Sequence, residues 1–197
     1  MNCAYIVNVT RDTSTATTRD VLLTAAERLF LSDGYDDVSV RAICSAAGAN
    51  PAAVHYHFGS KDNLVVALLE DRLGPIWADP LDRVEPGSDS VRHIVGLIID
   101  PLISLQGDPL GHLHLRLLSR FVLTHPKAPW TGRWFRIDSW ARLLTASVPE
   151  LDEAAAARRW AFAFDLILTR VGAAEPLHPV AVTALADFVT AGLSAPA

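Results

Sequence analysis

The feature that most constrains this sequence is a series of three short apolar segments between residues 19 and 58, each closed by a glycine. The closing residues are Gly34, Gly48 and Gly59. Apolar residues in these segments recur at the three- and four-residue spacing of a helix that is buried on one side. A glycine after such a segment supplies the left-handed backbone conformation that commonly ends a helix. The pattern therefore predicts three helices, of which the second and third are short.

Short polar side chains precede each predicted helix and are expected to cap it. The expected N-caps are Thr18, Ser39, Asn50 and, for a fourth and longer helix, Ser60. Pro51 suits the first position of the third helix, because that position needs no amide donor. Within the fourth helix, Gly74 and Pro75 are expected to bend or stop the chain.

A helix followed by two short helices around a tight turn is the helix-turn-helix arrangement, whose second paired helix enters the DNA major groove. The small side chains of residues 46–49 let the two short helices approach closely. The apolar pattern alone would fit many three-helix bundles, and the turn residues narrow the choice. Residues 50–58 are therefore the predicted recognition helix of a DNA-binding domain that covers residues 19–65.

The segment AGANPAAVHYHFGSKDNL then resembles the signature of TetR/AcrR regulators. In that signature, Ala-Gly-Val-Ser is followed by a small residue, by Tyr-x-His-Phe-x-Ser-Lys and by a leucine. The matching positions here are Ala47, Gly48, Ala49, Asn50, Ala52, His57, Phe58, Ser60, Lys61 and Leu64. The resemblance covers residues 19–64 and implies a helix-turn-helix repressor. Where the family has its tyrosine this chain has His55, with an aromatic residue next at Tyr56, so either residue could make that tyrosine's DNA contact.

The predicted recognition helix contains no acidic residue, so it can approach the DNA phosphates without repulsion. Phosphate contacts set the register and base-edge contacts select the sequence. Lys61, at the start of the fourth helix, is expected to bind phosphate together with the free amides there. Tyr56 either contacts DNA or packs against the first helix. The expected DNA-contacting residues are Arg41, Asn50, Pro51, Ala52, Ala53, His55, Tyr56, His57 and Lys61.

Residues 66–197 form a second predicted region, which is also helical. Its expected helices, separated by prolines and glycines, cover residues 90–105, 111–124, 130–147, 150–170 and 179–193. Pro101 is expected to kink the first of them. The whole chain is predicted to be all-α, with about nine helices in two domains behind an N-terminal arm of residues 1–18.

The resemblance implies that the second region encloses a ligand pocket and ends in two helices that pair with their copies in a homodimer. The last two predicted helices carry more apolar surface than a small monomer buries comfortably. The apolar stripes in question include Leu168, Val171, Leu185, Val189 and Leu193. The competing interpretation is a core formed within one chain.

A ligand pocket is expected where leucines and aromatic residues of several helices meet, although core packing would explain most of them equally well. The candidate lining residues are Leu102, Leu105, Leu113, Leu117, Phe121, Trp130, Trp134, Phe135, Ile137, Trp140 and Phe164. The candidate polar anchors are His114, Arg116, Arg120 and Asp138.

Several other classes of protein find no support. No apolar run is long enough for a membrane span, and two cysteines suggest the reducing cytoplasm rather than a disulfide framework. His112 and His114 lie two positions apart on a helix and face different directions, so no metal site is expected. No nucleophile elbow, P-loop or dinucleotide motif appears, so neither a catalytic site nor a cofactor is expected.

Taken together, these patterns predict a cytoplasmic homodimeric repressor that binds a palindromic operator on double-stranded DNA. A small effector, apolar or aromatic, is expected to release it. The alternative is a helical ligand carrier or an enzyme that retains a vestigial helix-turn-helix.

Overall fold

The computed structural model describes residues 17–85 and 87–196 of the 197-residue chain. Within these ranges the fold is all-α, as predicted, with nine α-helices, one 3-10 turn and no strand. The helices are α1 (Thr18–Asp33), α2 (Val40–Ala46), α3 (Ala53–Phe58), α4 (Lys61–Asp82), α5 (Val91–Leu105), α6 (Pro109–Thr124), α7 (Ile137–Ser147), α8 (Glu153–Val171) and α9 (Pro179–Ser194), and the 3-10 turn η1 is Arg133–Phe135. The predicted arm lies outside the described residues, except for Thr17 and Thr18.

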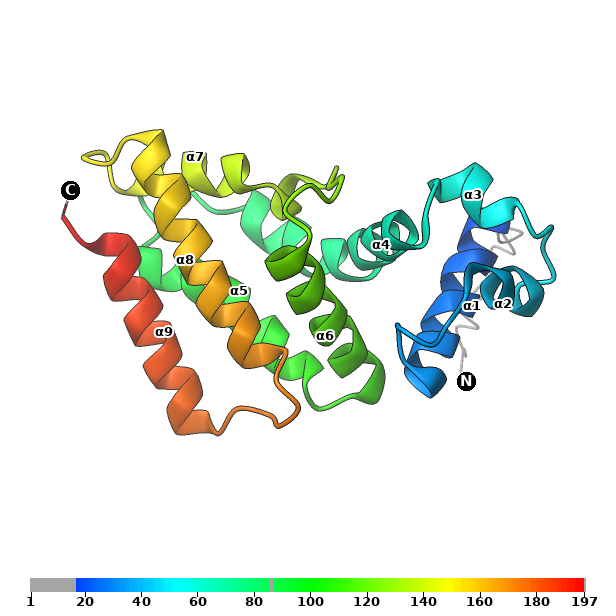
Figure 1. The fold of residues 1–197 in the computed structure, drawn as a ribbon. Helices are drawn as coiled ribbons and strands as arrows, with labels where there is room; N and C mark the ends of the chain where they lie inside the picture. The colour runs from blue at the N-terminus through cyan, green and yellow to red at the C-terminus, as the bar shows by residue number, and fades with distance from the viewer. Residues whose placement is uncertain (1–16, 86, 197) are drawn as a thin grey trace, which may run out of the picture.

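Helix α4 connects the two parts of the molecule. Figure 1 shows α1, α2 and α3 at one end and α5 to α9 as a larger bundle at the other, with α4 between them. Helix α4 packs against α1 and α3 on one side and against α5 and α6 on the other. Its buried residues run from Leu64 to Leu81, so one apolar core continues from α1, α2 and α3 into the bundle. A displacement of α4 would therefore move side chains both in the α1–α3 part and in the α5–α9 bundle.

The N-cap of α1 is Thr17, and not Thr18 as predicted. The Thr17 hydroxyl accepts a hydrogen bond from the Asp20 amide at 3.3 Å, and the Asp20 carboxylate accepts one from the Thr17 amide at 3.1 Å. This reciprocal pair is a capping box, which satisfies two amides that the helix itself leaves unpaired. The second residue of the box, Asp20, is the signal that distinguishes the two threonines.

Gly74 and Pro75 do not stop α4, which continues through Pro75 and Pro80 to Asp82. A proline inside a helix removes one backbone hydrogen bond and crowds the preceding turn. Here Leu73, Trp77 and Leu81 are all buried on the bundle side of this segment. Burial of three large side chains offsets the cost of the prolines. Helix α5 likewise continues through Pro101.

The helix predicted over residues 130–147 begins later, at Ile137, after the separate turn η1. The amides of Thr131 and Gly132 donate to the Glu70 carboxylate of α4, at 2.7 Å for Gly132. Because these amides are bound to α4, they are not part of a helix that would extend α7 toward residue 130. Residues 125–132 contain no helix.

Candidate nucleic-acid interface and ligand cavity

Helices α2 and α3 are positioned by caps and by one close turn. The Ser39 hydroxyl accepts a hydrogen bond from the Ala42 amide at 3.1 Å, which confirms Ser39 as the N-cap of α2. Gly48 follows α2 with a φ of +60°, a conformation that glycine adopts at little cost. Ile43 of α2 and Val54 of α3 are fully buried, so the turn folds the two helices onto a common core.

Helix α3 is shorter than the predicted recognition helix, because Pro51 and Ala52 form a turn and the helix begins at Ala53. The Asn50 side chain accepts a hydrogen bond from the Ala52 amide at 2.9 Å and stabilises that turn. The prediction of Asn50 as the N-cap of this helix is therefore wrong: the N-cap is Ala52, and no side chain caps the first turn of α3. The C-terminal end of α3 lies at Gly59, as predicted, with a φ of +79°.

Five of the predicted DNA-contacting residues surround one open groove between α1 and the helix-turn-helix, with a volume of about 630 Å³. These residues are Asn50, Ala52, Ala53, Tyr56 and His57. Ala53 borders the groove but is itself buried, at 8% exposed, so it offers little surface for a DNA contact. Arg41, Pro51 and His55 are exposed outside the groove lining. The groove therefore places the second half of the turn and one face of α3 on the same accessible surface.

The structure distinguishes His55 from Tyr56. The Nδ1 atom of His55 is 2.8 Å from the Gly59 carbonyl oxygen, so the ring is bound to the C-terminal end of its own helix. Tyr56 is 84% exposed and its ring meets His57 edge to face at 5.0 Å. The alternative in which Tyr56 packs against α1 is therefore wrong, and Tyr56 is the aromatic side chain that α3 presents to solvent.

Lys61 is held within the protein. Its ammonium donates to the backbone carbonyl of Tyr35 and lies 4.0 Å from the centre of the Tyr35 ring. Partial burial lowers the pKa of Lys61, and the nearby carboxylates of Asp36 and Asp62 oppose that shift. The expected phosphate contact of Lys61 stays a prediction, and it would require the ammonium to leave the Tyr35 carbonyl.

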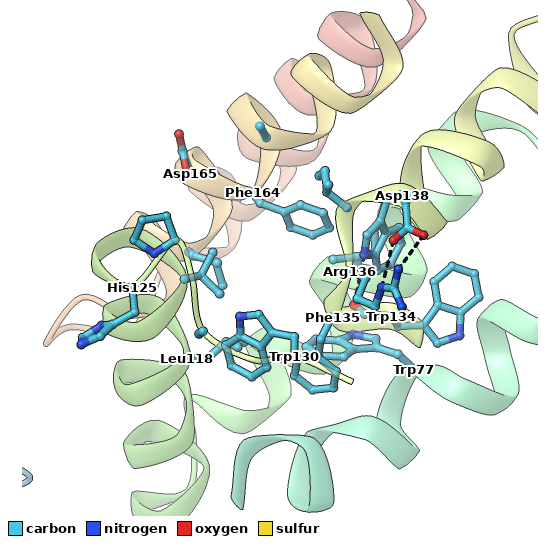
Figure 2. Close-up of a pocket in the computed structure, with 18 of the residues that line it drawn as sticks. Trp77, Leu118, His125, Trp130, Trp134, Phe135, Arg136, Asp138, Phe164 and Asp165 are labelled. Carbon is cyan, nitrogen blue, oxygen red and sulfur yellow. Dashed lines mark hydrogen bonds and ion pairs between the residues drawn. The ribbon is translucent and has the colours of Figure 1, made fainter. Parts of the chain in front are cut away.

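A second hollow of about 640 Å³ lies inside the bundle, between α4, α5, α6, α7, α8 and the segment that contains η1. Figure 2 shows Trp77, Trp130 and Phe135 on one side of this cavity and Phe164 on the other. Seven predicted residues line it: Leu102, Trp130, Trp134, Phe135, Ile137, Trp140 and Phe164. A space of this size with mostly apolar walls is typical of small-molecule sites.

Four predicted lining residues lie elsewhere: Leu105, Leu113, Leu117 and Phe121. On α6 the cavity is lined by Leu118 and Val122, one position after Leu117 and Phe121, because successive residues of a helix point about 100° apart. Phe121 instead packs edge to face against Tyr35. Sequence reasoning missed Trp77, because the helix that carries it was expected to bend or stop at Pro75.

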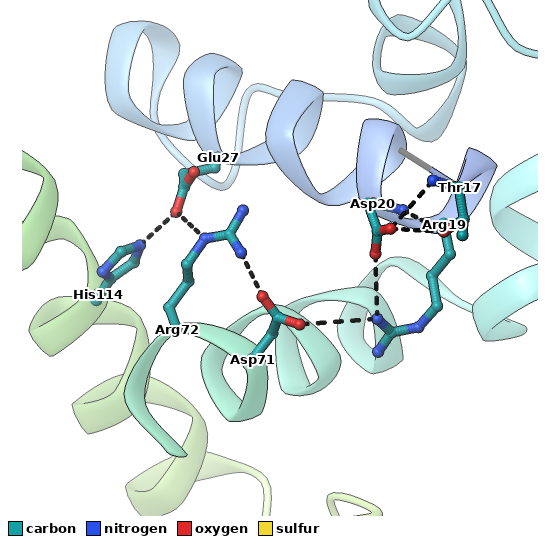
Figure 3. A network of polar contacts seen from close by, with 7 residues as sticks. All are labelled: Thr17, Arg19, Asp20, Glu27, Asp71, Arg72 and His114. Atoms are coloured by element: carbon teal, nitrogen blue, oxygen red, sulfur yellow. Dashed lines mark hydrogen bonds and ion pairs between the residues drawn. The ribbon is translucent and has the colours of Figure 1, made fainter. Parts of the chain in front are cut away.

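Of the candidate polar anchors, only Asp138 lines the cavity, where the Arg136 guanidinium donates to its carboxylate at 3.2 Å. Arg116 is exposed outside the lining. His114 is buried at the contact between α6 and α1, where its Nε2 atom is 2.7 Å from the Glu27 carboxylate. Figure 3 shows Glu27 between His114 and Arg72, whose Nε atom donates to the same oxygen at 3.0 Å.

Burial alone would raise the pKa of Glu27, but the hydrogen bonds from His114 and Arg72 outweigh it and hold that pKa below its usual value. The carboxylate is therefore ionised at neutral pH and links α1, α4 and α6. The sequence analysis did not predict the contact between Glu27 and His114.

The apolar stripes predicted for a dimer face are only partly buried within the chain. Their buried members are Leu168, Val171, Leu185, Val189 and Leu193, whereas Ala154 and Ala161 of the same α8 stripe are exposed. The large apolar side chains that α8 and α9 expose are Phe162, Val180 and Phe188, each at least 70% exposed, and none of them belongs to the predicted stripes. Helical periodicity shows that α8 and α9 are apolar. It does not show which side of each helix packs within the chain and which side remains exposed.

Some other features of the described residues bear on function. They contain no group of three or more histidine, cysteine or acidic side chains placed to hold a metal ion. Cys44 is buried as a free thiol. None of the helices described has both the length and the hydropathy needed to cross a bilayer.

The model of the family "Bacterial regulatory proteins, tetR family" matches residues 22–68. The regulator UidR of Escherichia coli K12 is 26% identical over 97 residues, which are 48% of this chain and 45% of UidR. The nicotine-responsive repressor HdnoR of Paenarthrobacter nicotinovorans is 38% identical over 87 residues, 44% of each chain. The matched part thus spans less than half the length of these two relatives.

Solved structures extend the likeness to most of the chain. NalD of Pseudomonas aeruginosa, described as the secondary repressor of the MexAB-OprM multidrug efflux pump, superposes with a TM-score of 0.57. It is 21% identical, and the alignment covers 89% of this chain and 95% of NalD. Salmonella enterica GusR gives a TM-score of 0.58 at 20% identity, with 89% and 95% covered. Residues 22–68 therefore match the model of the TetR family of bacterial regulatory proteins, and the described helices share the fold of these solved structures.

Proposed function

We propose that this chain is a transcriptional regulator that binds operator DNA as a homodimer and leaves it when a small aromatic molecule enters the bundle. Residues 19–65 would read the DNA, and residues 66–197 would bind the ligand and the second copy. The observation that carries the proposal is the exposed, acid-free face of α3, with Tyr56 and His57 on the rim of the open groove.

The proposed DNA contacts combine base reading on α3 with backbone contacts around it. Asn50, Pro51, Ala52, Ala53, Tyr56 and His57 would lie in the major groove, with His55, Arg41 and Lys61 toward the phosphates. Residues 19–62 hold four basic and six acidic side chains, so affinity must depend on where the charges lie and on two copies. Strongly salt-dependent binding and weak binding by a monomer are expected.

Footprinting on the DNA that flanks its own gene tests this interface. The intact protein should protect an inverted repeat, and Tyr56→Ala should weaken protection about tenfold or more, the cost of one good groove contact. Leu31→Ala is the matched control, because Leu31 is a half-exposed apolar residue of α1 outside the groove. Unchanged affinity of Tyr56→Ala, or an equal loss in both variants, would contradict the assignment of α3.

The proposed dimer pairs α8 and α9 of two copies across Phe162, Val180 and Phe188. Large apolar side chains that stay exposed on neighbouring helices are candidates for an interaction surface in a soluble protein. Phe188→Asp should convert a dimer into a monomer in sedimentation velocity. Leu123→Asp, which places the same charge on an exposed apolar site of α6, should leave the dimer intact. A wild-type chain that sediments as a monomer would refute the dimer.

The proposed ligand class is a neutral, flat aromatic compound, because aromatic side chains from four elements line the cavity. The nicotine response in the name of HdnoR supports an aromatic effector for a related protein, and the carrier or enzyme alternative is not favoured. The uncharged dye N-phenyl-1-naphthylamine, whose fluorescence rises in apolar surroundings, is a suitable probe. Its fluorescence should rise with the wild-type chain and rise much less with Phe164→Asp. Equal signals from the two proteins would show that the dye binds elsewhere.

A further inference from the structure

Helix α6 and its C-cap His125 contact the N-terminal part of the molecule at two separate places. Nearer its N-terminal end, His114 meets Glu27 of α1. Nearer its C-terminal end lies a second group of side chains, here called the Tyr35 junction. The junction comprises Tyr35, Asp36, Lys61, Asp62, Arg120, Phe121 and His125.

Tyr35 is the centre of this junction. The Tyr35 hydroxyl donates to the Asp62 carboxylate, and the ring meets Phe121 edge to face at 5.6 Å. The Arg120 guanidinium lies 4.6 Å from the ring centre and donates to both oxygens of Asp36, at 2.7 and 2.8 Å. Burial and the hydrogen bond to Asp62 raise the pKa of Tyr35, so the hydroxyl remains a donor at all physiological pH values.

The junction holds both ends of the segment that contains α2 and α3. Tyr35 and Asp36 lie in the loop just before this segment, and Asp62 lies in the first turn of α4, just after it. Lys61 joins these two ends directly through the Tyr35 carbonyl. A movement of α6 at the junction would therefore act on both flanks of the helix-turn-helix at once.

The same junction reaches the cavity. His125 lines the cavity and stacks on Phe121 with ring centres 4.5 Å apart and planes 11° apart. Its Nε2 atom is 3.7 Å from the Asp62 carboxylate. The contact between Glu27, Arg72 and His114 contributes no residue to the cavity lining. Of these two contacts, only the junction shares a residue with the cavity.

We propose that the Tyr35 junction transmits occupation of the cavity to the helix-turn-helix, while the Glu27–His114 contact is the fixed point of α6. The inference rests on the proposed function of the cavity. A ligand that displaces His125 shifts Phe121, and Phe121 in turn shifts Tyr35 away from Asp62. The segment with α2 and α3 then loosens at both ends, and the two recognition helices of a dimer lose their fixed spacing.

Hydrogen exchange of the full-length chain, with and without saturating N-phenyl-1-naphthylamine, tests this proposal. Dye fluorescence reports binding in the same samples. In the wild-type chain the dye should accelerate exchange of amides 35–62 by about threefold or more, since coupling between sites is commonly about fivefold upward. Arg120→Gln removes the guanidinium that lies over the Tyr35 ring and binds Asp36, so the loop that carries Tyr35 is released even without ligand. In this variant the dye should bind within about twofold of wild type, and the acceleration should disappear.

Arg133→Gln is the matched control. Arg133 is also an exposed arginine, its Nη1 atom lies 2.8 Å from the carboxylate of Asp82, and its guanidinium lies 4.6 Å from the Trp134 ring centre. Loss of the response in Arg120→Gln with retention in Arg133→Gln supports the proposal. Three outcomes overturn the proposed role of the junction but leave the proposed cavity function intact. They are dye binding without acceleration in the wild type, a response kept in Arg120→Gln, and a response lost in both variants. Absence of dye binding to the wild type overturns the proposed cavity function as well.

Discussion

Replacement of the His114 side chain, which binds the Glu27 carboxylate, tests the energetics of the contact between α6 and α1. His114→Leu keeps the buried apolar volume and deletes a donor that lies 2.7 Å from the Glu27 oxygen. A hydrogen bond to a charged group contributes about 1.5–3 kcal/mol, and a buried carboxylate that loses all partners costs more. Here Glu27 keeps Arg72 at 3.0 Å. The expected cost is therefore about 2 kcal/mol, or roughly 4–8 °C in Tm for a chain of this length.

Urea unfolding at pH 7 measures this cost in a double-mutant cycle of His114→Leu, Glu27→Leu and the double variant. The free energy of unfolding lost in the two single variants, added together, should exceed the loss in the double variant by about 1.5 kcal/mol or more. The reason is that each single variant removes the same hydrogen bond. If the two single changes in free energy of unfolding add up to the double change within about 0.5 kcal/mol, Glu27 and His114 do not stabilise the fold through their contact. If His114→Leu is more stable than the wild type, the hydrogen bond does not stabilise the fold and the reasoning is refuted.

Three further results are expected. The lowered pKa of Glu27 means that its ionised form stabilises the fold at pH values above 4.5, the ordinary pKa of a glutamate. The stability advantage of the wild type over Glu27→Gln should therefore vanish as the pH falls below 4.5. A difference in urea unfolding that does not change with pH would contradict this prediction. Gly172→Ala should cost about 1–3 kcal/mol in thermal unfolding, because its Cβ would lie 2.6 Å from Ser119, whereas Gly192→Ala, with open space around it, should stabilise α9 by about 0.5 kcal/mol. Ser39→Ala should cost about 1 kcal/mol through loss of the α2 cap, and an unchanged Tm would show that the cap contributes nothing.

The helix-turn-helix was predictable because its determinants are local. Ser39, Ser60 and the glycines at positions 34 and 59 act within a few residues of themselves, and the structure confirms the ends that they set. The continuation of α4 past Pro75 was not predictable, since it depends on the burial of Trp77 and Leu81 by distant helices. A local rule about proline cannot include that compensation.

The candidate sites were predictable only in part, because periodicity shows that a helix face is apolar without showing what covers it. Leu117 and Phe121 were expected at the cavity and instead pack within the core, whereas Val122 reaches it. The contact of Glu27 with His114 and the Tyr35 junction join residues far apart in the chain. Their partners are set by the crossing of α6 over α1 and α4, which no single segment encodes.

The central claim is that α3 reads DNA in two symmetry-related copies. Selection of bound duplexes from a random-sequence pool by the full-length protein tests it most directly. The account predicts enrichment of an inverted repeat whose half-site centres lie about one helical turn, or a small multiple of it, apart. Enrichment of a single unrepeated motif, or no enrichment at low salt, would contradict the claim.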